Sequence, residues 1–342
     1  MFPPRPRLAV TLGDSAGIGP ELVLQALASP DLADLCQLIV YGNLTLLRRV
    51  ATTTGLPLSE SLAVLPYSGV APPSLPHDRH LLFDFPFAEA ATLTPGIVQV
   101  ACGRSAYAWI CAAVRDLQAG VADALVTAPV NKEALHLAGV GFPGHTEILS
   151  CLTRTPNPCM ACYSPGLVIS LATIHEPLAN VPRLLSVETL LRTLRLTHAA
   201  CQGFGIPAPR LGVLALNPHA GENGLFGHEE QTAILPAIEK AKAEGIHASG
   251  PLVPDTAFIG LSTRPPHPPF DAYIAMYHDQ GLIPFKMVAF DSGVNLTLGL
   301  PLIRTSPDHG TAFDLAWQGK ASPSSLFSAI TLATRMAHAL VP

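Results

Sequence analysis

Short apolar runs alternate with helix-like segments along the chain, and few folds accommodate such an alternation. The runs are rich in Val, Ile, Leu and Ala and too short to cross a bilayer, so they are typical of buried parallel strands. The runs that we expect to form strands are residues 8–12, 37–42, 122–130, 167–175, 210–219 and 271–279. Strands that alternate with helices in this way form sheets with helices on both faces. The sequence therefore predicts an α/β protein.

Helices are expected between these runs, at residues 20–29, 100–117, 187–201 and 231–244. The last of them contains Pro236, which lacks a backbone N–H and should split or kink the helix. Two proline-rich stretches, "APPSLPHDRH" at 71–80 and "STRPPHPPFD" at 262–271, are expected to form stiff surface loops.

Length, charge and cysteine content exclude several classes of function. A chain of 342 residues can form two domains, and a net charge of −5 without a run of Lys or Arg argues against a nucleic-acid partner. We expect neither a membrane segment nor a secretory signal, and therefore a cytoplasmic protein. The 7 cysteines do not suggest a disulfide framework. Cys159 and Cys162 have the C-x-x-C spacing of a redox pair or half a zinc site, but packing thiols within a strand are favoured.

Three histidines stand at the ends of three strand-like runs: His175 after "LVISLATI", His219 after "LGVLALNP" and His278 after "DAYIAMY". Parallel strands deliver their carboxyl ends to one edge of a sheet, where neutral imidazoles can converge on a divalent ion. A single histidine in such a place is more often structural, but three in equivalent positions favour a shared metal site. Asp279 is either a carboxylate that orients His278 or a solvated loop residue.

Other polar residues suit an anionic substrate. They are His145 and Thr146 in "GFPGHTEIL", and Lys286, Asn295 and Arg304 in "PFKMVAFDSGVNLTLGLPLIRTSPDHG". Lysine offers a compact charge and arginine a planar fork for phosphate or carboxylate. Ordinary surface charge is the alternative, but the apolar surroundings of Lys286 and Arg304 favour contact with a ligand.

Two glycine-rich stretches have more than one interpretation. The loop "GDSAGIGPE" either presents backbone N–H groups to an anion or is a tight turn between strand and helix. "GVGFPG" at 139–144 matches the G-x-G-x-x-G pattern of dinucleotide-binding folds. We expect this match to be false, because a helix-like segment precedes it instead of a strand.

Five long motifs resemble the 4-hydroxythreonine-4-phosphate dehydrogenase family of vitamin B6 biosynthesis. They are "TLGDSAGIGPEL", "GHTEIL", "LNPHAGENGLFG", "YHDQGLIPFK" and "VNLTLGLPLIRTSPDHGTAFDLA", and the likeness extends from about residue 8 to the C-terminus. The resemblance implies two α/β/α domains like those of isocitrate and isopropylmalate dehydrogenases, with an active-site cleft at the interface of a homodimer. The expected domains are residues 1–130 with 296–342, and residues 131–295, which carry the metal ligands and the dimer interface.

The resemblance also implies cofactors and roles for individual residues. NAD or NADP is the expected oxidant, bound by residues that the sequence does not identify. One divalent metal per subunit, zinc, magnesium or cobalt, would be held by His175, His219 and His278 in active sites shared between the two subunits. The implied substrate contacts are His145, Thr146, Lys286, Asn295 and Arg304. Asp255 and Lys286 are the candidates for the proton acceptor.

The implied reaction is oxidation of 4-(phosphooxy)-L-threonine to a 3-keto acid that loses carbon dioxide to give 3-amino-2-oxopropyl phosphate. Ser15 stands where the family commonly has proline in "GDPAGIGPE", and "ATIHEPL" differs from the usual Thr-Thr-His context. A related dehydrogenase of another phosphorylated hydroxy acid, such as 4-phosphothreonate, is therefore the first alternative. A metal-dependent binding or hydrolytic protein with the same histidines is the second.

Overall fold

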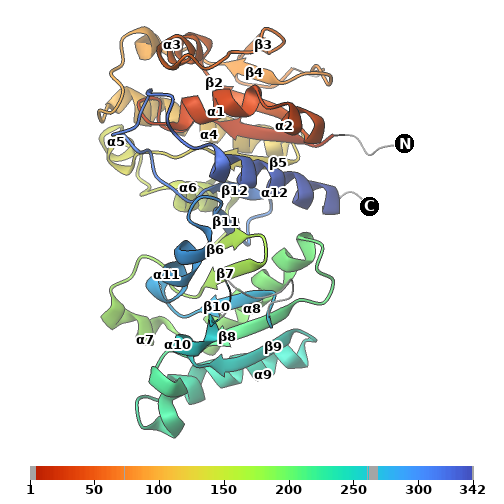
Figure 1. The fold of residues 1–342 in the computed structure, drawn as a ribbon, viewed down its shortest axis with the longest axis vertical. Helices are drawn as coiled ribbons and strands as arrows, with labels where there is room; N and C mark the ends of the chain where they lie inside the picture. The colour runs from red at the N-terminus through yellow and green to blue at the C-terminus, as the bar shows by residue number, and fades with distance from the viewer. Residues whose placement is uncertain (1–4, 73, 260, 262–268, 341–342) are drawn as a thin grey trace. The chain divides into compact units, whose positions relative to one another are not determined.

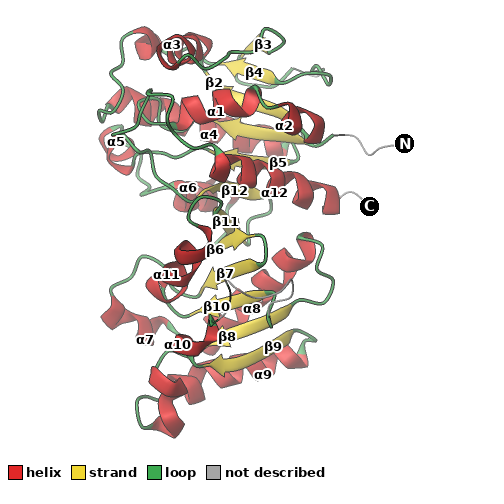
Figure 2. Cartoon of the chain, viewed as in Figure 1, coloured by secondary structure: helices red, strands yellow, loops and turns green. Residues whose placement is uncertain are grey.

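The chain folds into two compact units that both have the predicted α/β character (Figures 1 and 2). The computed structural model describes residues 5–72, 74–259, 261 and 269–340, so most of the proline-rich stretch 262–271 lies outside the described residues. The first unit comprises Met1–Pro158 and Leu300–Pro342, and the second Cys159–Gly299.

The first unit contains a sheet of parallel strands in the order β3-β4-β2-β1-β5-β12. The strands are β1 (Arg7–Thr11), β2 (Gln37–Gly42), β3 (Ala63–Pro66), β4 (Leu81–Asp84), β5 (Ala124–Thr127) and β12 (Arg304–Pro307). The helices are α1 (Gly19–Leu27), α2 (Pro30–Leu35), α3 (Leu44–Thr54), α4 (Val100–Gln118), α5 (Lys132–Leu137), α6 (His145–Thr153) and α12 (Ser324–Leu340). In Figure 1, α1 and α12 lie in front of this sheet and α4 lies behind it. Every residue of β2 and β5 is buried, as expected for strands covered on both faces.

Residues 131–158 belong to the first unit, although the sequence suggested a boundary at residue 131. The reason is close packing between α4 and α5. A Cβ atom on Gly103 of α4 would lie 2.1 Å from the carbonyl oxygen of Ala134 in α5, so only glycine permits this approach. The same segment contains "GVGFPG", which follows α5 and precedes α6. The absence of a strand before it within this described segment confirms that it is no dinucleotide fingerprint.

The second unit contains a mixed sheet in the order β11-β6-β7-β10-β8-β9. Its strands are β6 (Cys159–Ser164), β7 (Leu167–Leu171), β8 (Arg210–Leu214), β9 (His247–Leu252), β10 (Ala272–Ala275) and β11 (Val294–Leu298). Its helices include α8 (Val187–Gly203), α9 (Leu235–Ala243), α10 (Pro254–Ala257) and α11 (His278–Ala289). Strands β7, β10, β8 and β9 are parallel, whereas β6 pairs antiparallel with both β7 and β11. The antiparallel pairs were not predicted from the sequence.

Side-chain alternation along β7 shows which helices cover each face of this sheet. Ile169 and Leu171 belong to an apolar cluster with Phe285 of α11. Ser170 points to the other face, where its Oγ accepts a hydrogen bond of 2.7 Å from Thr197 Oγ1 of α8. Helices α11 and α8 therefore cover opposite faces, and α11 begins at the edge of the sheet where β10 ends.

Two other sequence predictions concern Pro236 and the C-x-x-C pair. Pro236 is the second residue of α9, and a π-helical turn, Glu230–Ile234, precedes it, so the expected interruption of the helix is confirmed. Cys159 and Cys162 are free thiols buried in β6. Residues three apart in a strand point to opposite faces, which rules out a shared disulfide or metal site in this conformation.

The loop "GDSAGIGPE" is a tight structural turn. The backbone N–H groups of Asp14, Gly17 and Ile18 already donate to carbonyl oxygens within the unit, and that of Ala16 donates to Asp14 Oδ1. These N–H groups are therefore not available to an anion. Burial raises the pKa of Asp14 to about 6 despite the hydrogen bonds from the backbone of Ala16 and Asn131.

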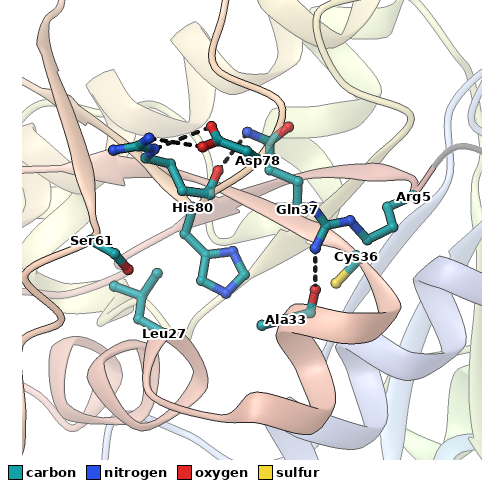
Figure 3. A pocket seen from close by; sticks show the side chains of 9 residues that line it. Arg5, Leu27, Ala33, Cys36, Gln37, Ser61, Asp78 and His80 are labelled. Carbon is teal, nitrogen blue, oxygen red and sulfur yellow. Dashed lines mark hydrogen bonds and ion pairs between the residues drawn. The ribbon is translucent and has the colours of Figure 1, made fainter.

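His80 lines a surface pocket of about 330 Å³ in the first unit (Figure 3). It is the last residue of the proline-rich stretch 71–80 and precedes β4. Its Nδ1 accepts a hydrogen bond of 3.0 Å from the backbone N–H of Leu38, so the ring is neutral with its proton on Nε2. Burial, with a smaller contribution from the positive charge of Arg5, lowers the pKa of His80 to about 4.

Acid should therefore destabilise this unit through His80. Because the folded-state pKa lies below the ordinary value of about 6.5, the unfolded chain binds the proton more tightly, and stability is lost as the pH falls from about 6.5 to about 4. We expect about 2 kcal/mol less unfolding free energy from this group at pH 5 than at pH 7.5. Urea unfolding of the native chain and of His80→Asn, which keeps an acceptor for Leu38 but does not titrate, measures the difference. Equal losses in both chains would contradict the assignment.

Candidate metal and anion sites

The three strand-end histidines of the sequence prediction follow three adjacent parallel strands of the second unit. The order β7-β10-β8 sets the ends of these strands side by side, and His175, His278 and His219 follow them respectively. The predicted common edge is therefore present within a single unit. This follows from the register of the sheet, in which Ala275 of β10 is level with Leu171 of β7.

Hydrogen bonds connect the three strand ends to one another. Thr173, after β7, donates from its Oγ1 to the carbonyl oxygen of Met276, after β10, at 2.7 Å. Gln280, in the first turn of α11, connects the end of β10 to the end of β8. Its Oε1 accepts from the backbone N–H of Met276 and its Nε2 donates to the carbonyl oxygen of Ala215, after β8, both at 2.7 Å. The segments that lead to the histidines are thus held at fixed separations.

His175 and His278 lie close enough to act as a pair. Their ring centroids are 5.8 Å apart, near the separation of about 5 Å for two imidazoles that bind one ion at about 2 Å. Asp279 Oδ1 lies 2.7 Å from His278 Nδ1, which orients the imidazole and leaves Nε2 for a ligand. Among the residues that the structure describes, no group of three or more His, Cys, Asp or Glu side chains is arranged to hold a metal ion. The pair fits a divalent cation, and the complete three-histidine site stays a prediction.

His219 lies in an unusual turn. It opens a run of left-handed residues, His219 to Asn223, in which only Gly221 lacks a side chain. Left-handed backbone costs an ordinary residue about 1–2 kcal/mol, so such a run persists only where its surroundings enforce it. The ring of His219 lies 6.4 Å from that of Phe226, between centroids. The turn therefore sets the direction of His219.

Glu230, from the π-helical turn, lies beneath this segment and is almost fully buried. Its Oε1 accepts from the backbone N–H groups of Leu216 and Asn217, at 2.9 and 2.8 Å, and its Oε2 accepts from Asn217 Nδ2 at 3.0 Å. Burial by itself would raise the pKa of Glu230, but these hydrogen bonds outweigh it and the pKa lies below its usual value. Glu230 is therefore a carboxylate at neutral pH.

A second group of polar residues, all in the first unit, could hold an anion. Arg304 of β12 is buried, and its Nη2 donates to Thr127 Oγ1 at 2.7 Å. Burial lowers the pKa of Arg304 only to about 10, so it is charged at neutral pH. Burial, and then the charge of Arg304, hold the pKa of His145 well below its usual range. His145 Nε2 is buried without a hydrogen-bond partner among the described residues. A fixed cation beside a neutral imidazole suits a phosphate or carboxylate.

Known proteins match this chain in sequence and in fold. Residues 34–333 match the family model described as pyridoxal phosphate biosynthetic protein PdxA. The chain belongs to this family. A curated PdxA relative, 4-hydroxythreonine-4-phosphate dehydrogenase of Geobacter metallireducens, is 44% identical over 98% of the chain and 96% of its own length. D-threonate 4-phosphate dehydrogenase of Pectobacterium atrosepticum is 40% identical over 96% of the chain and 99% of its own length.

A solved PdxA-type structure shows the same fold. The crystal structure of 4-hydroxythreonine-4-phosphate dehydrogenase from Klebsiella pneumoniae has a TM-score of 0.85 and 39% identity, over 98% of this chain and 99% of that one. The predicted family and the α/β class are therefore confirmed, and the chain is a member of a family of dehydrogenases. No helix among the described residues is long and apolar enough to span a membrane.

The remaining residues predicted from the PdxA-type motifs lie in the second unit. Thr146 is the exception, since it follows His145 in α6 of the first unit. Lys286 lies on α11, two turns beyond His278, with its Nζ 5.9 Å from the ring centroid of Phe290. Asn295 is half-buried in β11. Asp255 is exposed in α10, which packs against the turn that carries His219. The roles of these residues stay predictions.

Sequence reasoning missed three residues that support the two candidate sites. Thr127, Glu230 and Gln280 each hold a predicted site residue or the segment that carries it. Gln280 is part of the motif "YHDQGLIPFK", and Glu230 lies three residues beyond the motif "LNPHAGENGLFG". Their function depends on contacts between residues far apart in the sequence, which a motif does not reveal.

Proposed function

We propose that this PdxA-family member oxidises 4-(phosphooxy)-L-threonine with NAD⁺ or NADP⁺ in pyridoxine 5'-phosphate biosynthesis. A hydride leaves C3 of the substrate for the nicotinamide, the C3 hydroxyl loses its proton, and the resulting 3-keto acid releases carbon dioxide to give 3-amino-2-oxopropyl phosphate. The observation that carries the proposal is the common sheet edge of His175, His278 and His219 in a chain that is 44% identical to a curated enzyme of that name.

A divalent cation, zinc, magnesium or cobalt, belongs to this proposal, with His175, His219 and His278 as its ligands. When bound, such a cation acts as a Lewis acid that favours loss of the hydroxyl proton and stabilises the enolate of decarboxylation. The contact of Asp279 with His278 Nδ1 supports this use, because it fixes the ring tautomer in which Nε2 is unprotonated and can bind the cation.

The anion contacts hold and orient the substrate. Arg304 and His145 offer donors for a phosphate or carboxylate group, with Thr146 beside them at the start of α6. Lys286 and Asn295 are proposed as further contacts. Binding both ends of the substrate aligns C3 with the nicotinamide and lowers the entropic part of the barrier. Asp255 and Lys286 are the proposed proton acceptors.

A homodimer with active sites shared between subunits is part of the proposal, as is a general architecture like that of isocitrate and isopropylmalate dehydrogenases. Helix α11 exposes large apolar side chains beside Lys286, with Ile283 60%, Met287 83% and Phe290 73% exposed. Apolar side chains gathered on one exposed face are typical of interfaces between proteins. This face supports an interface at α11, close to the proposed metal and substrate contacts.

The decisive experiment follows NADH absorbance while substrate, cation and cofactor are varied separately. We expect NADH or NADPH only when 4-(phosphooxy)-L-threonine, a divalent cation and the matching oxidised cofactor, NAD⁺ or NADP⁺, are all present. A chain that binds the cation but never reduces the cofactor would instead be a binding or hydrolytic protein.

The second candidate substrate is 4-phosphothreonate, because the chain is also 40% identical to a D-threonate 4-phosphate dehydrogenase. The two compounds differ at C2, where one carries an amino and the other a hydroxyl group. The ratio of kcat/KM for the two, measured with the same cofactor, decides between them. A higher value for the threonate would replace the proposed substrate and keep the reaction type.

Lys286→Ala should raise KM for the phosphorylated substrate at least about tenfold, because a charge-assisted hydrogen bond is worth about 1.5–3 kcal/mol. Lys240→Ala, which removes an exposed lysine from α9, is the matched control and should leave KM unchanged. Initial rates over a range of substrate concentrations measure both. An unchanged KM in Lys286→Ala would remove this lysine from the anion site.

A further inference from the structure

The chain that leaves β8 toward His219 is held by two side chains that are not themselves predicted ligands. We call residues 215–217 the β8 exit. Gln280 Nε2 donates to the carbonyl oxygen of Ala215 at 2.7 Å, and Glu230 Oε1 accepts from the backbone N–H groups of Leu216 and Asn217 at 2.9 and 2.8 Å. Three consecutive residues of the β8 exit are therefore fixed, two positions before His219.

Glu230 also lies against the turn beyond the β8 exit. A Cβ atom on Gly221 would lie 2.7 Å from Glu230 Oε2, so the backbone of the turn packs closely against the carboxylate. Gly221 is itself left-handed, with φ of +77°. His219 thus lies between two points, the β8 exit and Gly221, that the same carboxylate contacts. This support explains how a strained left-handed run can persist.

Gln280 relates the β8 exit to the other histidines. Its Oε1 accepts from the backbone N–H of Met276, two residues before His278, so one amide group joins the strands that lead to His219 and His278. Both donor and acceptor of this amide are used, which fixes its orientation. The distance between the two imidazole-bearing segments therefore depends on Gln280.

We propose that Glu230 and Gln280 are positioning residues that hold His219 in place for a divalent cation without touching the cation. The inference rests on the proposed function for the cation site itself. Mutation of a residue that holds a metal ligand in position lowers metal affinity by about 10–100-fold in known proteins. We expect a loss of about tenfold here, because each side chain acts through the backbone.

The test measures binding of Co²⁺ alone to the full chain freed of metal, by calorimetry and by the visible absorption of bound Co²⁺. Glu230→Gln removes the carboxylate at nearly constant volume, and Gln280→Met removes both hydrogen bonds at similar length. The matched controls are Glu239→Gln and Gln202→Met, exposed residues of α9 and α8. The proposal expects about tenfold weaker binding and an altered Co²⁺ spectrum in both test variants, and native values in both controls.

Thermal unfolding of the metal-free variants separates positioning from general loss of structure. We expect Gln280→Met to unfold within a few degrees of the native chain while it binds Co²⁺ more weakly. Should Glu230→Gln fail to fold, native Co²⁺ affinity and spectrum in Gln280→Met would by themselves overturn the proposal.

His219→Ala distinguishes failure of this inference from failure of the proposed function. If Co²⁺ binding does not depend on His219, the proposed cation site is wrong. If binding depends on His219 but is native in both Glu230→Gln and Gln280→Met, only the positioning role is wrong.

Discussion

His219→Ala should lower kcat at least about a thousandfold and leave the fold intact. The variant removes one proposed nitrogen ligand, and the Lewis acid that such ligands hold contributes several kcal/mol to stabilising the charge that develops during reaction. The ring is exposed and lies at the carboxyl end of β8, outside the apolar core. Its loss should therefore cost little stability. Turnover with saturating NAD⁺ and Mg²⁺, Zn²⁺ or Co²⁺ measures the effect.

His247→Ala is the matched control, since it removes another exposed histidine of the second unit, at the start of β9. It should retain native kcat and native metal content. Full activity in His219→Ala, with unchanged metal content, would defeat the assignment of His219 as a ligand. Equal losses in both variants would instead indicate a general effect on the unit.

Arg304→Lys should raise KM for the phosphorylated substrate about a hundredfold. Lysine keeps the charge but lacks the planar fork, so it cannot make two parallel hydrogen bonds to phosphate or carboxylate. Loss of one of the two charge-assisted hydrogen bonds, worth up to about 3 kcal/mol, corresponds to a factor of about one hundred. Because burial lowers the pKa of Arg304 only to about 10, the effect should be constant from pH 6 to 8.

Thr127→Val provides the comparison for Arg304. It removes the hydroxyl that accepts from Arg304 Nη2 at 2.7 Å and leaves the guanidinium in place. We expect a rise in KM of about tenfold, from loss of orientation alone. Steady-state kinetics measure KM. Circular dichroism checks that each variant is folded, because both residues are buried. A native KM in a folded Arg304→Lys would exclude this arginine from substrate binding.

Much of the fold could be predicted because local patterns dominate it. The long helix expected at 100–117 is α4, and Pro236 interrupts its helix because the missing N–H acts locally. The antiparallel direction of β6 was not predicted, since pairing direction depends on partners far away in the sequence. The first unit extends beyond the expected domain limit near residue 131, because α5 packs closely on α4, an approach that only glycine at position 103 permits.

The candidate sites likewise combine features that the sequence revealed with features that only the structure revealed. The sequence identified His175, His219 and His278 as strand-end residues, because apolar runs that stop at a polar residue mark the rim of an α/β sheet. It also suggested an anion cradle or a tight turn at "GDSAGIGPE". The tight turn is the correct interpretation, because the backbone N–H groups of Asp14 and its neighbours donate to carbonyl oxygens within the unit. Asp14 itself was overlooked as a buried carboxyl group, since burial is not visible in a sequence.

By itself, the amino-acid sequence determined the α/β class, the family and the residue types available for chemistry, because periodicity and long motifs are local properties of the chain. Only the tertiary structure decided the strand order β7-β10-β8, and with it which histidines lie near one another. It also decided that Gln280 and Glu230 hold the β8 exit, and that burial leaves His145 neutral beside a charged Arg304. These properties depend on distances and solvent exposure, which arise only when segments far apart in the sequence pack together.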